Sequence, residues 1–231
     1  MCGRFTLRAP ASQIAEQFSL FDAPELRPRY NIAPTQPVPV VRLQPDGEGN
    51  DKPDGERRRE LVHLHWGLIP HWADDPSIGN RMINARSETV AQKPAYKAAF
   101  RRRRCLVLAD GFYEWRKTGR AKQPYFIHLA DDRPFAFAGL WESWEGADHS
   151  YIESCTLLTG EPNEVVRPIH DRMPVILAPD AYARWLDVSI EDPRQLEPLL
   201  APYPAAEMRA RQVSRHVNNP RNDDERCIAT I

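Results

Sequence analysis

Hydrophobic and polar residues alternate along much of this chain, and the pattern predicts a fold built mainly from strands. Residues 61–66 alternate over most of their length, as a strand with one buried face does. Residues 105–109 are continuously apolar, which indicates a strand covered on both faces. Similar patterns predict further strands at residues 37–43, 112–115, 124–129, 134–140, 151–158, 175–177 and 204–213. Residues 124–129 and 134–140 are expected to pair with each other around the turn Asp131-Asp132.

Helical spacing of apolar residues is confined to short segments. Residues 11–18 form an amphipathic helix pattern, with Ser12 as the expected N-cap. Comparable spacing predicts helices at residues 93–104, 180–185 and 194–200. The proline-interrupted residues 24–39 are expected to be irregular. Because strands dominate, we predict an α+β fold with a mixed, mostly antiparallel, partly closed β-sheet core and short flanking helices.

Length and composition fit one domain over residues 1–231. The chain is 42% hydrophobic, which is enough for a substantial core. Residues 44–60 are polar, rich in glycine and proline, and without periodicity. We interpret them as a surface loop inserted between two strands.

Charge and cysteine usage narrow the possible environments. The formal net charge of −1 gives no overall field toward nucleic acid, so any such binding requires local patches. No run of 18 apolar residues and no signal-peptide pattern are visible. The four cysteines are scattered without a CxxC pair, which favours free thiols in a reducing cytoplasm.

Cys2 is the most reactive candidate in the sequence. Removal of Met1 would leave this cysteine with a free α-amine beside its thiol, a 1,2-aminothiol. Such a pair condenses with an aldehyde, first to an imine and then to a five-membered thiazolidine. The amine titrates near ~7.7–8.0 and the thiol near ~8.5, so both are partly reactive at neutral pH. The alternative is a frayed chain start without function.

Two further residues suit proton transfer. Glu114 lies between Tyr113 and Trp115 after a buried strand, where poor solvation would raise its pKa. His170 lies in a rigid, proline-flanked segment and titrates near ~6.5 in its unperturbed state. The alternatives are a glutamate that points to water and a core histidine bonded to a backbone carbonyl.

Other polar and aromatic residues suggest substrate contact. Asn84 and Arg86 share a face if their segment is extended, where an amide can orient a substrate and an arginine can grip phosphate. The same segment can instead begin a helix. The arginines of 101–104 are expected to be solvated, with nucleic-acid contact as the second interpretation. Trp66 and Trp72 can stack on unpaired bases or pack in the core.

The sequence argues against a metal or cofactor site. His63, His65 and His71 are near one another, but no cysteine pair or carboxylate completes a usual ligand set. The chain also lacks a glycine-rich phosphate loop and a GxSxG elbow. We therefore expect neither a metal nor a cofactor.

Six ordered motifs resemble those of the SRAP (SOS-response-associated peptidase) family, the abasic-site processing proteins. The motifs are MCGRF from Met1, YNIAPT from Tyr30, WGLIP from Trp66, NARSET from Asn84, DGFYEW from Asp110 and HDRMP from His170. The resemblance extends from Met1 to about Cys227. It implies capture of abasic sites in single-stranded DNA, whose ring-opened sugar carries an aldehyde, as a thiazolidine crosslink that protects the lesion.

The resemblance also implies site residues. Cys2 would be the nucleophile, Asn84 would position its amine and the opened sugar, Glu114 would act as acid and base, and His170 would assist proton transfer and reversal. Phosphate-holding arginines and segments lining the DNA surface are also implied, at Arg4, Arg86, Arg172, Pro34, Trp66 and Thr159. A monomer that binds abasic single-stranded DNA, without membrane contact, is expected, and its binding should weaken with salt.

Two other functions remain open at this point. Cys2 with His170 and Glu114 can form a cysteine-type peptidase, including one that removes Met1 itself. Lyase activity on abasic sites is a related possibility. A non-covalent reader of modified DNA bases would need neither the thiol nor an aldehyde.

Overall fold

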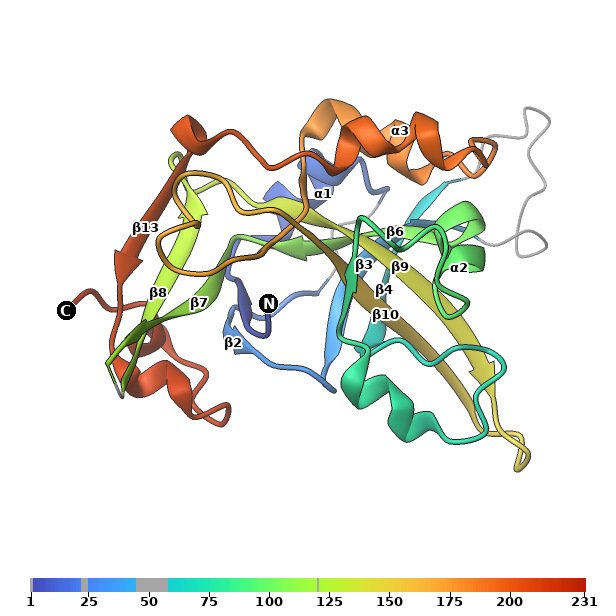
Figure 1. The fold of residues 1–231 in the computed structure, drawn as a ribbon, viewed down its shortest axis with the longest axis horizontal. Coiled ribbons are helices and arrows are strands. Elements are labelled where there is room, and N and C mark those ends of the chain that lie inside the picture. Colours follow the sequence, from blue (N-terminus) through green and yellow to red (C-terminus); the bar gives the residue numbers. More distant parts are fainter. Residues whose placement is uncertain (1, 22–24, 45–57, 120) are drawn as a thin grey trace.

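The computed structural model describes residues 2–21, 25–44, 58–119 and 121–231, which fold around two β-sheets (Figure 1). The five-stranded sheet has the order β13-β8-β7-β1-β2. Its strands are β13 (Met208–Gln212), β8 (Ala121–Leu129), β7 (Gly111–Thr118), β1 (Phe5–Leu7) and β2 (Arg29–Ile32). All four pairings in this sheet are antiparallel.

The eight-stranded sheet is partly closed. Its main path is β11-β10-β4-β3-β6-β9-β12, β5 also pairs with β10, and a further pairing of β9 with β10 closes a ring of five strands. The strands are β3 (Pro37–Leu43), β4 (Arg59–Trp66), β5 (Asn84–Arg86), β6 (Arg104–Ala109), β9 (Phe135–Glu145), β10 (Tyr151–Gly160), β11 (Met173–Pro174) and β12 (Ile176–Leu177). Only β4 and β5 run parallel to their partner β10 among the described pairings. The predicted α+β class with a mixed, mostly antiparallel and partly closed sheet is confirmed.

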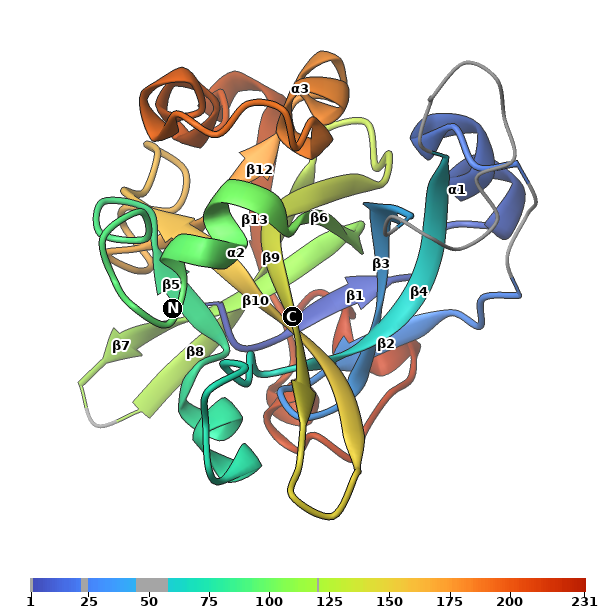
Figure 2. The same ribbon diagram turned by 90° about the vertical axis from the view of Figure 1, so that its right-hand side faces the viewer.

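The helices are short and lie outside the sheets (Figure 2). They are α1 (Ala11–Phe18), α2 (Lys97–Arg102) and α3 (Tyr182–Leu186). The prediction of Ser12 as N-cap is wrong, because α1 already begins at Ala11 after Pro10, whose carbonyl accepts from Ile14 N at 3.1 Å. The predicted helix at 93–104 is shortened at both ends, since turns precede Lys97 and β6 begins at Arg104. The predicted helix at 194–200 consists of two 3-10 turns, Pro193–Gln195 and Glu197–Leu200.

Two strand predictions need correction. The strands β8 and β9 flank the turn at Asp131-Asp132 but do not pair with each other, because β8 joins the five-stranded sheet and β9 joins β6 and β10. The chain therefore crosses from one sheet to the other at this turn. The segment expected to be irregular, residues 24–39, contains β2. Its run of alternating hydrophobic and polar residues is short, but it forms a strand because it pairs with β1 at the edge of the sheet. The predicted late strand is present as β13.

The inserted loop falls mostly on residues 45–57, which lie outside the described residues, as does Met1. Its flanks agree with the prediction, since β3 and β4 pair antiparallel from Pro37 with His65 to Leu43 with Arg59. In the described part of the chain, no helix is both long and apolar enough to cross a bilayer.

Phe5 connects β1 to the main hydrophobic core. Its ring lies 5.0 Å from Trp66 and 5.7 Å from Phe137, centroid to centroid, and none of the three is exposed. Burial of three large aromatic side chains is worth several kcal/mol on the scale of about 1.5–3 kcal/mol for each large apolar side chain. This packing fixes the start of the chain in the interior of the molecule.

Candidate functional site

Cys2 is held between the two sheets. Phe5, three residues later, pairs with Phe112 of β7 on one side and with Ile32 of β2 on the other. The buried carboxylate of Asp110 strengthens this arrangement, because it accepts from the backbone N–H of Ala9 at 2.9 Å. Cys2 is consequently fully buried, although it is the second residue of the chain.

Asn84 binds the backbone of Cys2 from the other sheet. Its side-chain Nδ2 donates to the carbonyl oxygen of Cys2 at 2.7 Å. The segment is extended as predicted, because β5 runs parallel to β10 with Asn84 opposite Leu157. The indole of Trp66 donates to the carbonyl of Ile83 at 2.9 Å and so fixes the residue before Asn84. The Oδ1 atom of Asn84 is buried without a hydrogen-bond partner among the described residues, which leaves an acceptor for a substrate or amine.

Glu114 supplies a buried carboxyl group from β7. Its residue is only 3% exposed, and burial raises the pKa of the carboxyl above its ordinary value of 4.5. Its Oε2 lies 4.0 Å from Nε2 of His170. The predicted environment of Glu114 is therefore present, and the residue does not point to open solvent.

The ring of His170 has a defined orientation. The backbone N–H of Arg172 donates to its Nδ1 at 3.0 Å, and its Nε2 faces Glu114. Asp171 Oδ1 also lies 2.9 Å from Nδ1, a contact that is attractive only when Nδ1 carries a proton, and that side chain is 89% exposed. The arrangement permits proton exchange between His170 and Glu114.

Burial raises the pKa of the Cys2 thiol well above its ordinary value, and the negative charge of Glu114 raises it further. The thiol hydrogen is directed to the carbonyl of Arg4, with Sγ and O 3.7 Å apart. Cys2 is therefore a neutral thiol at neutral pH, unlike the low-pKa thiolates of cysteine peptidases.

A cavity of about 460 Å³ adjoins these groups. It is lined by Arg4, Glu114, Trp115, Lys117, Lys122, His170 and Asn218. Lys117 and Lys122 are directly opposite each other at the end of the β7–β8 hairpin. Like charges in such a cross-strand pair are unfavourable, so the pair is better suited to an anionic ligand than to the protein alone.

The sequence analysis did not single out Lys117, Lys122 or Asn218. Lys117 could have been found from the period of two along the predicted strand, because Trp115 and Lys117 fall on the same face. Asn218 carried no comparable signal. It reaches the cavity because the indole of Trp115 donates to its Oδ1 at 2.8 Å, a contact between residues far apart in sequence.

The three predicted phosphate-binding arginines differ in their surroundings. Arg86 on β5 is exposed. Arg4 is half-buried and lines the cavity, and its guanidinium donates to Asn31 Oδ1 and to the carbonyl of Val217, both at 2.9 Å. Arg172 forms a bidentate ion pair with Glu88 at 2.5 and 2.9 Å, which neutralises its charge. Contact of these arginines with DNA stays a prediction, and Arg86 is the most accessible of the three.

The predicted DNA-facing segments are mostly interior. Trp66 is fully buried against Phe5, which agrees with the core-packing alternative for its ring and disfavours base stacking. Thr159 is also fully buried, and its hydroxyl donates to the carbonyl of Ala85 at 3.4 Å. Pro34 is partly exposed in the turn after β2. That these segments line a DNA-binding surface stays a prediction, and Pro34 is the most accessible of the three residues.

The histidines considered in the sequence do not assemble a metal site in the described part of the chain. A search of these residues for three close ligand atoms finds His216, Asp224 and Cys227 instead, near the C-terminus. The candidate site itself consists of the cysteine at position two, an amide, a buried carboxyl and an imidazole, a set of groups that can support nucleophilic addition with proton transfer.

The fold has two sheets, and Cys2 is held between an asparagine and a glutamate–histidine pair. Together these features point to one class of protein. A family profile described as SOS response associated peptidase (SRAP) matches residues 1–220, and the chain belongs to this family. Among its relatives, the abasic site processing protein YoaM of Bacillus subtilis (strain 168) is 44% identical over 99% of this chain and 97% of its own. Abasic site processing protein YedK of Escherichia coli (strain K12) is 31% identical over the full length of both chains.

Solved structures agree with this assignment at the level of the fold. A crystal structure of a protein from Bacteroides thetaiotaomicron superposes with a TM-score of 0.85 and covers 100% of both chains. Its sequence identity is 23%, so the likeness concerns the fold alone.

Proposed function

We propose that this protein captures abasic sites in single-stranded DNA as a thiazolidine crosslink through Cys2, after removal of Met1. The observation that carries the proposal is the position of Cys2, whose carbonyl is held by Asn84 while the charge of Glu114 acts on its thiol. The names of the relatives YoaM and YedK, both abasic site processing proteins, support the same substrate.

The reaction joins two atoms of Cys2 to one carbon of the sugar. In the ring-opened deoxyribose, C1′ is an aldehyde carbon. The α-amine of Cys2 adds to it, and the resulting hydroxyl leaves as water with a proton from Glu114. The nitrogen then gives its remaining amine proton to the Glu114 carboxylate, which leaves a neutral imine and restores the carboxylic acid. The thiol then adds across the C=N bond: sulfur bonds to C1′, the thiol proton passes to nitrogen, and the thiazolidine closes. One water is lost overall, and no oxidant or reductant is needed.

The surroundings of Cys2 favour this order of steps. Because burial raises the pKa of the thiol, a thiolate is scarce at neutral pH and the amine is the better first nucleophile. A neutral Glu114 is suited to protonate the departing oxygen, since its own pKa is raised by burial. When its ring has been protonated from solvent, His170, whose Nε2 lies 4.0 Å from the carboxylate, can return a proton to Glu114 and become neutral. The same relay, run backward, would release the crosslink.

The cavity beside the site is lined by groups that suit a single strand of DNA. Lys117, Lys122 and Arg4 line it, and they suit the phosphates that flank a lesion. Trp115 borders the same space and is only partly buried, so it offers a ring face to a neighbouring base.

A denaturing gel tests the proposal. The protein is incubated with single-stranded DNA that contains uracil and with a uracil glycosylase, which creates the abasic site in place. The wild-type chain should give a slowly migrating band, and Cys2→Ala should give none. A Cys2→Ala band as strong as that of the wild type would overturn the covalent mechanism and leave a non-covalent reader.

Self-processing is a separate activity that the same site can support. The raised pKa of the Cys2 thiol argues against a preformed nucleophilic thiolate, so a general peptidase is the weaker candidate. Intact mass of the Glu114→Ala protein distinguishes the routes to a free Cys2. Retention of Met1 in that variant alone would support self-cleavage, and equal loss in both proteins would assign the step to a host aminopeptidase.

A further inference from the structure

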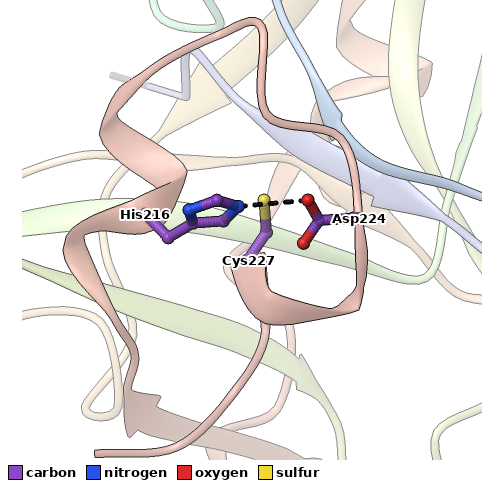
Figure 3. Close-up of side chains that lie close together, drawn as sticks. All are labelled: His216, Asp224 and Cys227. Atoms are coloured by element: carbon purple, nitrogen blue, oxygen red, sulfur yellow. Dashed lines mark hydrogen bonds and ion pairs between the residues drawn. The ribbon is translucent and has the colours of Figure 1, made fainter.

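A second cluster of reactive side chains lies near the C-terminus, outside the candidate site. The 3-10 turns Arg215–Asn218 and Glu225–Cys227 bring together His216, Asp224 and Cys227 (Figure 3). One ligand atom from each lies within 4.8 Å of the other two. His216 Nε2 and Asp224 Oδ2 are 3.1 Å apart, and the sulfur of Cys227 lies beside them.

The connecting loop holds these side chains in place. Asn222 Nδ2 donates to the carbonyl of His216 at 2.8 Å, and the thiol of Cys227 donates to the carbonyl of Asn222 with a sulfur–oxygen distance of 3.4 Å. Asp224 accepts from the backbone N–H of Arg226 at 2.9 Å as the cap of its turn. The three ligand atoms are therefore positioned by the fold before any ligand arrives.

The donor set selects a class of metal. Thiolate, imidazole and carboxylate together suit Zn²⁺ and related transition ions, whereas Mg²⁺ and Ca²⁺ prefer oxygen donors alone. Zinc–ligand bonds of about 2.0–2.3 Å in a tetrahedron separate the ligand atoms by roughly 3.3–3.8 Å. The separations here, from 3.1 to at most 4.8 Å, bracket that range, so movements of about 1 Å complete the geometry.

Charge and access are also compatible with a divalent ion. One thiolate and one carboxylate neutralise a 2+ charge once the exposed side chain of Arg226, which lies 2.8 Å from Asp224 Oδ2, releases that oxygen to the ion. Cys227 is fully buried, while the side chains of His216 and Asp224 are 22% and 40% exposed, so the ion would have an entry path and water as a fourth ligand. The ion needs the lone pair of His216 Nε2, which moves the ring proton to Nδ1. Asn222 Nδ2 lies 3.1 Å from Nδ1 and would have to move away from the newly protonated nitrogen while it keeps its hydrogen bond to the carbonyl of His216.

We propose that His216, Asp224 and Cys227 form a site for one zinc-class transition ion that fastens the C-terminal turns to each other. The proposed metal site is connected to the cavity beside Glu114 by Val217 and Asn218, the two residues that follow His216. The carbonyl of Val217 accepts from Arg4, and Asn218 lines the cavity. Bound metal would thus stabilise the segment that contacts Arg4 and lines the cavity. The ion takes no part in the reaction at Cys2.

Metal titration of the full chain tests this site. After treatment with a chelator, and with a reductant that does not bind metal, the protein is titrated with Co²⁺ and Zn²⁺. We expect one ion per chain, a thiolate-to-cobalt charge-transfer band, and a melting temperature that rises with Zn²⁺ concentration. Cys227→Ser should lose the charge-transfer band, and His216→Ala should bind at least tenfold more weakly.

A matched control is His63→Ala, which removes an exposed histidine on β4 and should bind metal as the wild type does. If Cys227→Ser fails to fold, His216→Ala carries the comparison, because its side chain is partly exposed. Absence of binding by the wild type, or equal binding by all variants, would overturn the site. Neither result affects the test of Cys2, so the two proposals fail separately.

Discussion

The side chain of Asn84 holds the backbone of Cys2, with 2.7 Å between Nδ2 of the amide and the carbonyl oxygen. The two residues are 82 positions apart in the sequence. Strand β5 of the eight-stranded sheet thereby holds the segment that leads into β1 of the five-stranded sheet. The chain start of most proteins is frayed, but this one is tied down at the second residue. Precise placement is what a two-step ring closure on one carbon requires.

Loss of the Asn84 amide should slow crosslinking more than it destabilises the fold. Asn84→Ala removes one hydrogen bond, worth about 1 kcal/mol of unfolding free energy. Misplacement of the reactive amine by about 1 Å can cost roughly 100-fold in rate. Single-turnover gels and urea melts measure the two effects. Asn80→Ala, at an exposed asparagine, is the control, and an unchanged rate in Asn84→Ala would contradict the positioning role.

The pH dependence of crosslinking should report Glu114. Burial raises the pKa of this carboxyl above 4.5, so it stays protonated to a higher pH than an ordinary glutamate and stops acting as an acid as the pH rises through its folded value. We expect the wild-type rate to rise with deprotonation of the Cys2 amine and then to fall. Glu114→Gln should be slower and should lack the alkaline decline. An identical decline in both proteins would assign it to another group.

The same shift predicts an effect on stability. A carboxyl whose folded pKa is raised destabilises the folded state as the pH rises above its ordinary value, because the unfolded chain releases the proton more readily. The melting temperature of Glu114→Gln should therefore exceed that of the wild type increasingly from about pH 4.5 upward. Glu164→Gln, at an exposed glutamate, should show no such trend. A constant difference across pH would argue against the raised pKa.

The lysine pair of the β7–β8 hairpin should contribute to DNA binding. Lys117→Ala or Lys122→Ala removes one charge from the cavity wall, and the slope of log affinity against log salt should become shallower by about 0.7 for each lost phosphate contact on a single strand. Folding should be unchanged or slightly improved, because the like-charged pair is relieved. Lys97→Ala on α2 is the matched control, and an equal slope in all variants would remove the lysines from the interface.

Trp66 offers a direct test of core packing against base stacking. Trp66→Ala should cost about 3–5 kcal/mol of unfolding free energy, because a fully buried indole leaves a cavity. Base stacking would instead cost about 1–3 kcal/mol of binding with little change in stability. Trp72→Ala, at a ring that is 52% exposed, should leave stability nearly unchanged. Urea melts of both variants and DNA titrations of the milder Trp66→Phe protein decide between the roles.

Several motif residues turn out to organise the fold. Asn31 is fully buried, and its amide donates to the carbonyls of Val217, Asn219 and Asn222, at 3.2, 3.1 and 2.7 Å. Asp110 holds the segment after β1 from the opposite side of the hydrogen bond, because its carboxylate accepts from the backbone N–H of Ala9. A sequence motif does not separate such residues from those that react, because both kinds are polar residues in unusual positions.

The sequence by itself determined the fold class, most strands and the family, because period-two patterns and ordered motifs are local. It did not determine which strands pair: β8 and β9 are neighbours in the chain but belong to different sheets. Tertiary structure alone placed Trp66 in the core, engaged Arg172 with Glu88, and joined His216 to Cys227. The burial of a side chain and its hydrogen-bond or ion-pair partners depend on contacts between segments that are distant in the sequence. A local pattern of residues does not specify those contacts.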